Sequence, residues 1–287
     1  MLRIAVPNKG TLSAPATQIL REAGYRQRRD DRDLVCTDAD NDVEFFYLRP
    51  RDIATYVGSG DLDLGITGRD LLFDADSGAE EILDLDFGGS VFRFAARPGS
   101  LGAGEFAPEA LAGRRIATAY PGAVQRWLTE RGVKADVIRL DGAVENAIRL
   151  GVADVVADVV STGATLRQAG LEPVGEPMLR SSALLVCRVG DDYSRRVGVA
   201  QLIRRLQGVL VARRYVMLAY DVRADQLEGA CALTPGIESP TISPLHREGW
   251  VAVQAMVLRV EVHRIMDELY DLGARAILVT DIHACRL

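Results

Sequence analysis

The stretch from Ala153 to Leu166, which reads ADVVADVVSTGATL, constrains the fold of this chain more than any other. Its first half is an apolar, valine-rich run broken only by Asp154 and Asp158, and this composition predicts a buried strand. The residues that follow supply a glycine for a tight turn and hydroxyls that can cap a helix. A strand that turns directly into a helix is typical of an α/β sheet.

The same turn has the features of an anion site. Free N–H groups converge at a helix N-terminus, and the helix dipole adds partial positive charge there. Hydroxyl groups beside them suit a phosphate monoester, and Asp158 is placed to meet a sugar hydroxyl or a hydrated cation. The alternative is an ordinary strand-to-helix turn capped by a hydroxyl, and this stretch by itself leaves both interpretations open.

Composition and missing motifs exclude several classes of function. The 287 residues suffice for more than one domain, and the net charge of −6 argues against nucleic-acid binding. Four cysteines without a C-x-x-C motif predict reduced thiols rather than a metal cluster or disulfides. The first 245 residues contain no histidine, so no Ser-His or Cys-His pair can form there. Without a Walker or Rossmann glycine motif, any bound ATP must be held in another way.

The start of the sequence and its hydropathy predict a cytoplasmic protein. The chain opens directly with LRIAVP, which indicates a first strand rather than a secretory leader. No apolar run approaches the roughly 20 residues that cross a bilayer, so no membrane contact is expected.

Polar residues follow predicted strands at several points, and strand ends are where ligands bind in open α/β sheets. They are Lys9 after the strand Leu2–Val6, Arg49 after Val43–Leu48, and Arg69 with Asp70 after Leu62–Thr67. Each alone could be a helix cap, a packing residue or a surface charge, but together they predict one shared crevice. The basic segment from Arg26 to Arg32 is interleaved with aspartates, and we interpret it as a solvated loop.

The remaining pattern predicts a return to the first sheet and then a separate small unit. A strand at 183–188 and a long helix at 193–212 complete the first part. From Tyr215 onward the order strand, helix, strand, strand, helix, strand is that of a ferredoxin-like unit. Such a unit can bind an effector, pair subunits or be purely structural.

A longer pattern carries a family resemblance. Its positions are Glu145, Gly151, Ala153, Val156, Asp158, Thr162, Gly163, Thr165 and Leu166. This order and spacing resemble the signature of the ATP phosphoribosyltransferase family, the first enzyme of histidine biosynthesis. The segments AVPNKG and GITGRD and the C-terminal third are also similar to this family, specifically to its long form.

The resemblance implies an α/β fold of two periplasmic-binding-protein-like lobes followed by a ferredoxin-like regulatory domain. Residues 1–90 with 183–212 would form the first catalytic lobe, residues 91–182 the second, and residues 213–287 the regulatory domain. The implied reaction transfers phosphoribosyl from phosphoribosyl pyrophosphate to N1 of ATP, giving N1-(5-phospho-β-D-ribosyl)-ATP and pyrophosphate, with Mg²⁺ as cofactor. It needs no side-chain nucleophile, in agreement with the missing histidines.

The resemblance also implies three groups of site residues, L-histidine as inhibitor, and a homo-oligomer that is a hexamer or a dimer. The phosphoribosyl pyrophosphate site comprises Glu145, Asp158, Ser161, Thr162, Gly163, Ala164 and Thr165, of which Glu145 and Asp158 could reach a metal through water. The ATP site comprises Lys9, Gly10, Arg49, Asp70 and Tyr120. The histidine site comprises Asp221, Ile237, Thr241 and Ala276.

Two other functions fit parts of the sequence. A binding protein could close two lobes on an anion without catalysis, although such proteins are mostly exported. A regulatory subunit would explain residues 215–287 but not the predicted phosphate loop. A phosphoribosyltransferase explains both features.

Overall fold

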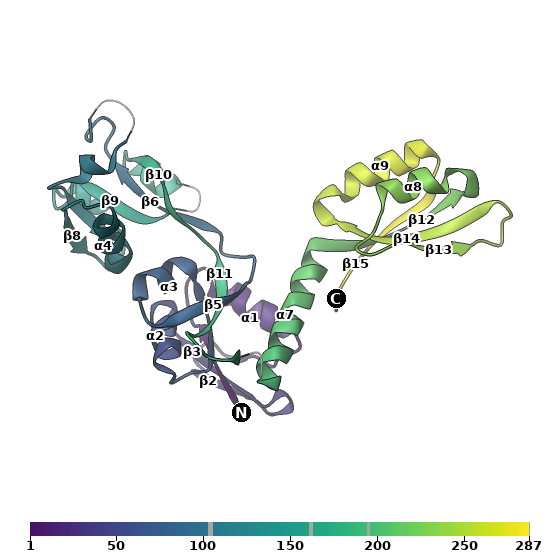
Figure 1. The fold of residues 1–287 in the computed structure, drawn as a ribbon, viewed down its shortest axis with the longest axis horizontal. Coiled ribbons are helices and arrows are strands. Elements are labelled where there is room, and N and C mark those ends of the chain that lie inside the picture. The colour runs from purple at the N-terminus through teal and green to yellow at the C-terminus, as the bar shows by residue number, and fades with distance from the viewer. Residues whose placement is uncertain (103–105, 161–162, 194–195, 287) are drawn as a thin grey trace. The chain divides into compact units, whose positions relative to one another are not determined.

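The computed structural model describes residues 1–102, 106–160, 163–193 and 196–286. The chain divides into two compact units, one of residues 1–21 with 25–200 and one of residues 22–24 with 201–287. The first unit holds two sheets and the second holds one (Figure 1). The finer limits expected for the two lobes and the C-terminal domain stay a prediction.

Sheet A forms the first lobe, with strand order β2-β3-β1-β4-β11-β5. β3, β1 and β4 run parallel, while β2, β11 and β5 are antiparallel to their neighbours. Helix α2 packs Ile53 and Val57 against Ala5, Leu184 and Val186 of the sheet. The strands are β1 (Leu2–Pro7), β2 (Val35–Asp38), β3 (Val43–Leu48), β4 (Leu64–Gly68), β5 (Ala79–Asp84) and β11 (Ala183–Arg188), and the helices are α1 (Ser13–Glu22), α2 (Pro50–Ser59) and α3 (Arg69–Ala75).

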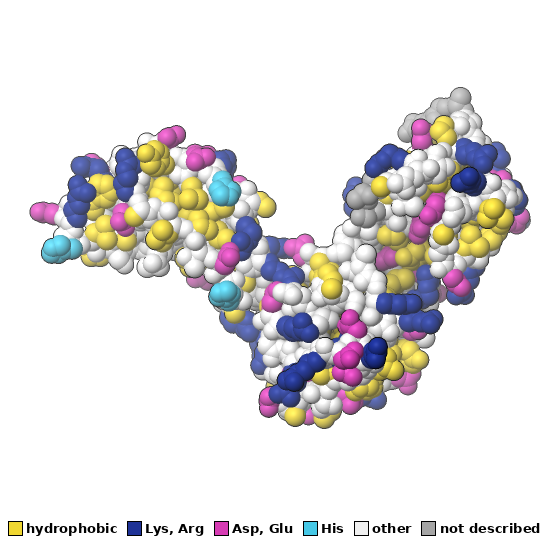
Figure 2. Space-filling model, turned by 180° about the vertical axis from the view of Figure 1, so that it is seen from behind, with side chains coloured by type: hydrophobic (Ala, Val, Ile, Leu, Met, Phe, Trp, Pro, Cys, Tyr) yellow, Lys and Arg dark blue, Asp and Glu magenta, His cyan; other side chains and the backbone are white. Residues whose placement is uncertain are grey.

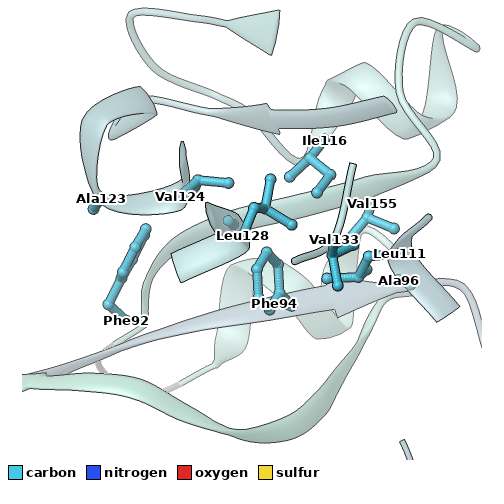
Figure 3. Packing of buried hydrophobic residues seen from close by; sticks show 11 residues of the cluster. Phe92, Phe94, Ala96, Leu111, Ile116, Ala123, Val124, Leu128, Val133 and Val155 are labelled. Carbon is cyan, nitrogen blue, oxygen red and sulfur yellow. The ribbon is translucent and has the colours of Figure 1, made fainter. Parts of the chain in front are cut away.

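Sheet B forms the second lobe, with strand order β10-β6-β9-β7-β8. Figure 3 shows its core, in which Phe92 and Phe94 of β6 pack with Val124 and Leu128 of α4. The strands are β6 (Ser90–Ala96), β7 (Arg115–Thr118), β8 (Asp136–Arg139), β9 (Val155–Val160) and β10 (Glu172–Ser181), and the helices are α4 (Pro121–Glu130), α5 (Asn146–Arg149) and α6 (Ala164–Gln168).

The chain passes from one lobe to the other and back. It leaves sheet A after β5 through residues 85–89, and it returns between β10 and β11 at Ser182. Each sheet therefore contains antiparallel strands next to its parallel core, β11 in sheet A and β6 in sheet B. This path of the chain confirms the two periplasmic-binding-protein-like lobes that the resemblance implied. The carboxyl ends of β1, β4 and β9 lie near the two crossings between the lobes.

The second unit has the expected ferredoxin-like order. Sheet C runs β13-β14-β12-β15, and two helices bury Ile265, Leu269 and Ala230 against it. Its elements are β12 (Tyr215–Arg223), α8 (Leu227–Leu233), β13 (Thr241–Pro244), β14 (Trp250–Leu258), α9 (Val262–Leu272) and β15 (Arg275–Asp281), preceded by α7 (Val197–Arg214). Hydrophobic side chains remain on its surface (Figure 2), among them Leu278, which is 63% exposed on an edge strand.

All three histidines, His246, His263 and His283, are exposed (cyan in Figure 2). Among the helices that the structure describes, none has the length and apolar composition required to span a bilayer.

Candidate active site

A cavity of ≈ 380 Å³ lies in the first unit where the two lobes meet, and we call it the crevice. Sheet A contributes the turn after β1, Pro50, Gly68 and Asp70, and sheet B contributes Tyr120 and Val159. Gly88, Gly89 and Ser181 from the two crossings complete one side of it. Four of the five residues predicted for ATP, namely Lys9, Gly10, Asp70 and Tyr120, thus line one cavity.

Asp70 is held in the crevice by a serine from the second lobe. It stands in the first turn of α3 and is 8% exposed. The Ser181 hydroxyl donates to Asp70 Oδ1 at 2.6 Å and accepts from the Asp70 backbone N–H at 3.0 Å. A Cβ on Gly68 would lie 2.3 Å from Asp70 Oδ1, so a larger residue at the end of β4 would displace the Asp70 carboxylate from this position. Because Ser181 and Asp70 are 111 residues apart, no local sequence signal predicts this pair.

Asp158 lies near the carboxyl end of β9 and carries an uncompensated charge. Its Oδ1 accepts from the Val159 backbone N–H at 2.8 Å, but none of the ion pairs in the described residues involves it. Burial, followed by repulsion from Glu145 and Asp70, raises the pKa of Asp158 to about 6. Asp158 therefore lies close enough to Glu145 and Asp70 for their negative charges to repel its own.

Tyr120 joins this cluster from the N-terminal end of α4. Burial and the neighbouring carboxylates Asp70 and Asp158 raise the pKa of its hydroxyl. Its ring packs on Phe92 with centroids 5.1 Å apart, and the Arg51 guanidinium lies 5.0 Å from its centroid. Tyr120 is therefore a neutral hydroxyl on a fixed ring, able to donate to a ligand or to a carboxylate.

Arg51 also belongs to a contact between the lobes that the sequence did not predict. Its Nη1 pairs with Asp74 Oδ2 at 2.6 Å, and Asp74 Oδ1 accepts from the Ala123 backbone N–H at 3.1 Å. A Cβ on Gly122 would lie 2.3 Å from the Asp74 carbonyl oxygen, so α3 and α4 approach closely only because residue 122 is glycine.

The remaining predicted residues lie around the crevice. Arg49 is exposed and directly precedes Pro50. Glu145 and Thr165 line a second cavity of ≈ 450 Å³. Gly163 adopts φ 71° at the start of α6, followed by Ala164, so the predicted glycine turn is present. Ser161 and Thr162 lie outside the described residues.

The described side chains do not form a cluster suited to direct metal ligation. In the described residues, no group of three or more His, Cys, Asp or Glu side chains is arranged to hold a metal ion. The proximity of Asp158 to Glu145 and Asp70 fits instead a hydrated cation held by the ligand's phosphates and bridged to carboxylates by water.

The residues predicted to bind histidine fall into two places in sheet C. Asp221 on β12 pairs with Arg275 across a bulge in β15, and Ala276 within that bulge has φ 50°. Thr241 begins β13 at the opposite edge of the sheet, with Ile237 in the segment before it. The described chain therefore brings Asp221 and Ala276 together but not all four residues.

Comparison with known proteins agrees with this geometry. A model of the ATP phosphoribosyltransferase family matches residues 49–208, and one of the HisG C-terminal domain matches residues 212–284. An ATP phosphoribosyltransferase from Salinispora tropica is 70% identical over 287 residues, and one from Streptomyces avermitilis is 62% identical over 289, each pairing covering 100% of both chains.

A solved structure is also similar. An ATP phosphoribosyl transferase (HisG:HisZ) complex from Thermotoga maritima is 26% identical, covers 72% of this chain and 97% of its own, and has a TM-score of 0.62. The two-lobed crevice, the family models and the full-length identity together show that this chain belongs to the ATP phosphoribosyltransferase family.

Proposed function

We propose that this chain transfers phosphoribosyl from phosphoribosyl pyrophosphate to N1 of ATP, as the first committed step of L-histidine biosynthesis. The observation that carries the proposal is the crevice, which is lined by Asp70 from one lobe and Tyr120 from the other and has the charge of Asp158 close to both. Membership of the family supports the identity of the two substrates.

In this proposal the two lobes hold different substrates. The turn from Ser161 to Thr165 binds the 5′-phosphate, and Asp158 with Glu145 orients the ribose hydroxyls. Lys9, Gly10, Arg49, Asp70 and Tyr120 bind ATP and the pyrophosphate. The carboxylate pair can accept hydrogen bonds from the ribose hydroxyls, and the cations can pair with the negatively charged phosphates.

The reaction itself is a displacement at the anomeric carbon. The N1 lone pair of adenine forms the new C–N bond while the C–O bond to pyrophosphate breaks and its electron pair leaves with pyrophosphate. Positive charge then develops on the sugar and negative charge on the leaving group. Asp158 and Glu145 would stabilise the former and Lys9 with Arg49 the latter, so catalysis rests on positioning and electrostatics.

Bound Mg²⁺ would neutralise charge on the pyrophosphate. Water-bridged contacts from Asp158 and Glu145 would hold it, because Mg²⁺ prefers oxygen ligands and retains several waters. We propose a cytoplasmic location, where both substrates are available.

The second unit is proposed to bind L-histidine as feedback inhibitor in a homohexamer, with a dimer as the alternative state. Asp221 would meet the α-amino group beside Ala276, which the bulge in β15 places next to it. Thr241 lies at the opposite edge of sheet C, so a second copy of the chain would have to bring it to the same ligand.

A coupled assay tests the reaction. ATP, phosphoribosyl pyrophosphate, Mg²⁺ and pyrophosphatase are mixed with the protein, and N1-ribosylated ATP is followed spectrophotometrically with and without L-histidine. Product that decreases on adding histidine supports both proposals. Product insensitive to histidine removes the effector site, and no product under any condition favours a binding protein.

A further inference from the structure

Arg28 is a buried arginine in a segment that its sequence predicts to be a solvated loop. It is 6% exposed, whereas Arg29 and Arg32 beside it are exposed. Removing a guanidinium from water costs several kcal/mol unless hydrogen bonds and charges replace its hydration. The expectation of a fully solvated loop was therefore wrong at this position, and the contacts of Arg28 show what its burial achieves.

The Arg28 guanidinium binds two parts of the first lobe at once. Its Nη1 donates to the backbone carbonyls of Asp31 at 2.6 Å and Asp33 at 3.0 Å, and its Nη2 lies 3.2 Å from the Asp31 carboxylate. The same Nη2 donates to the backbone carbonyl of Asn8 at 3.4 Å. Its Cζ stands 4.1 Å from the centroid of the buried Tyr47 ring, which fixes the plane of the fork.

Asn8 begins the turn that lines the crevice. Its backbone N–H donates to the Leu48 carbonyl at 2.8 Å, and the following residues Lys9 to Leu12 line the cavity. β3 thus holds the Asn8 N–H and Arg28 holds its carbonyl. The buried Asn8 Oδ1 has no hydrogen-bond partner in the part of the chain that the structure describes. The main chain of Asn8 is therefore held on both sides, at its N–H and at its carbonyl.

We propose that Arg28 is a positioning residue for the nucleotide side of the crevice. Its guanidinium clamps the Asn8 carbonyl to the loop of residues 28–33 and so presents Lys9 and Gly10 to the phosphates of ATP. Arg28 does not line the crevice, and it acts through the turn that does. The identity of the ligand rests on the proposed function, while the clamp rests on the contacts of Arg28.

The test compares Arg28→Lys with Arg196→Gln. Lysine keeps the positive charge but cannot donate in three fixed directions from one plane. Arg196 is the control, since its Nη2 pairs with Asp63 Oδ1 at 2.7 Å beside the amino end of β4, whereas the crevice lies at the carboxyl end of that strand. For each variant, amide hydrogen exchange of residues 8–12, the affinity for Mg-ATP by calorimetry, and Tm are measured.

Loss of the clamp should speed exchange in residues 8–12 and weaken Mg-ATP binding, each by about tenfold, as expected for a lost charge-assisted hydrogen bond. Arg196→Gln should lower Tm and leave both readouts unchanged. The proposal is overturned if Arg28→Lys lowers Tm as much as Arg196→Gln does but leaves the amide exchange and the Mg-ATP affinity unchanged. Arg28 would then be only a packing residue.

A second variant tests the clamp if Arg28→Lys does not fold, and amide exchange tests it if Mg-ATP does not bind. If Arg28→Lys does not fold, Asp31→Asn removes only the exposed carboxylate beside Nη2 and should give smaller shifts in the same direction; no shift would overturn the clamp. If the unaltered protein binds no Mg-ATP, the proposed function fails, yet the exchange of residues 8–12 still decides whether Arg28 fixes the turn.

Discussion

The two ends of strand β9 hold aspartates in opposite circumstances. Just before the amino end, Asp154 receives Arg115 Nη2 at 2.8 Å and Nε at 3.2 Å, and these bonds lower its pKa to about 2. Near the carboxyl end, Asp158 forms no ion pair in the described residues, and burial raises its pKa to about 6. Two identical side chains four positions apart therefore prefer opposite protonation states at mildly acidic pH.

Sheet A repeats the contrast. Asp63, just before β4, pairs with Arg196 at 2.7 Å, whereas Asp70, just after β4, is held by the Ser181 hydroxyl and lies near the other carboxylates. Asp154 and Asp63, just before the amino ends of β9 and β4, therefore each pair with an arginine. Asp158 and Asp70, at the carboxyl ends of the same two strands, form no ion pair in the described residues, which leaves negative charge for a ligand to use.

The largest effect should come from Asp158→Asn. The folded pKa of about 6 lies above the ordinary 3.8, so the folded state retains a proton that the unfolded chain has lost. Stability is therefore lost as pH rises from about 4 to 6, by about 3 kcal/mol at one pKa unit per 1.4 kcal/mol. Asparagine removes this loss, and urea unfolding at pH 7.5 should show a gain of about 2–3 kcal/mol that disappears at pH 4.

The same variant should lose activity. If Asp158 stabilises the developing positive charge on the sugar, kcat should decrease by about 10² or more, as for other preorganised electrostatic groups. A variant that is less stable than the parent at pH 7.5, or that keeps its full kcat, would remove the contrast between the two ends of β9.

An intermediate effect is expected from Ser181→Ala. The substitution leaves the buried Asp70 carboxylate without its 2.6 Å hydrogen bond, which should cost about 1–3 kcal/mol in unfolding free energy and raise KM for ATP about tenfold. Ser182→Ala is the matched control, because Ser182 donates to Asp84 at a similar 2.7 Å but beside Arg69 rather than in the crevice. Equal rises of KM in both variants would show that the crossing, not Asp70, governs ATP binding.

The strands that are apolar along their length could be predicted from the sequence. Several strands at sheet edges could not. β1, β3, β4, β9 and β11 are largely buried and read clearly as apolar runs. β5 contains two glutamates and β10 two prolines and a glycine, and both are edge strands with many exposed residues. An edge strand is paired on one side only and needs no apolar run, so its pattern resembles that of a loop.

The sequence predicted the crevice residues that follow strand ends. It did not predict the residues that support the crevice through contacts distant in the sequence. Lys9, Asp70 and Tyr120 follow strands, and the carboxyl ends of those strands meet. Ser181 and Arg28 act through partners 111 and 20 residues away, so no local pattern marks them. Alternating arginines and aspartates are typical of a solvated loop, and the burial of one of them depends on Tyr47 and Asn8.

The smallest effect should come from Asp154→Asn. The pKa of Asp154 is lowered from 3.8 to about 2, so its pairing with Arg115 contributes stability above pH 4 that is lost as pH falls through about 2. Because the Asp154 side chain is 33% exposed and that of Arg115 43% exposed, solvent screening limits the contribution to about 1 kcal/mol or less. Urea unfolding should show this loss at pH 7.5 and almost none at pH 2, with kcat and KM unchanged. A loss of activity comparable to that of Asp158→Asn would mean that both ends of β9 serve the crevice, and an unchanged stability at pH 7.5 would mean that Arg115 does not compensate Asp154.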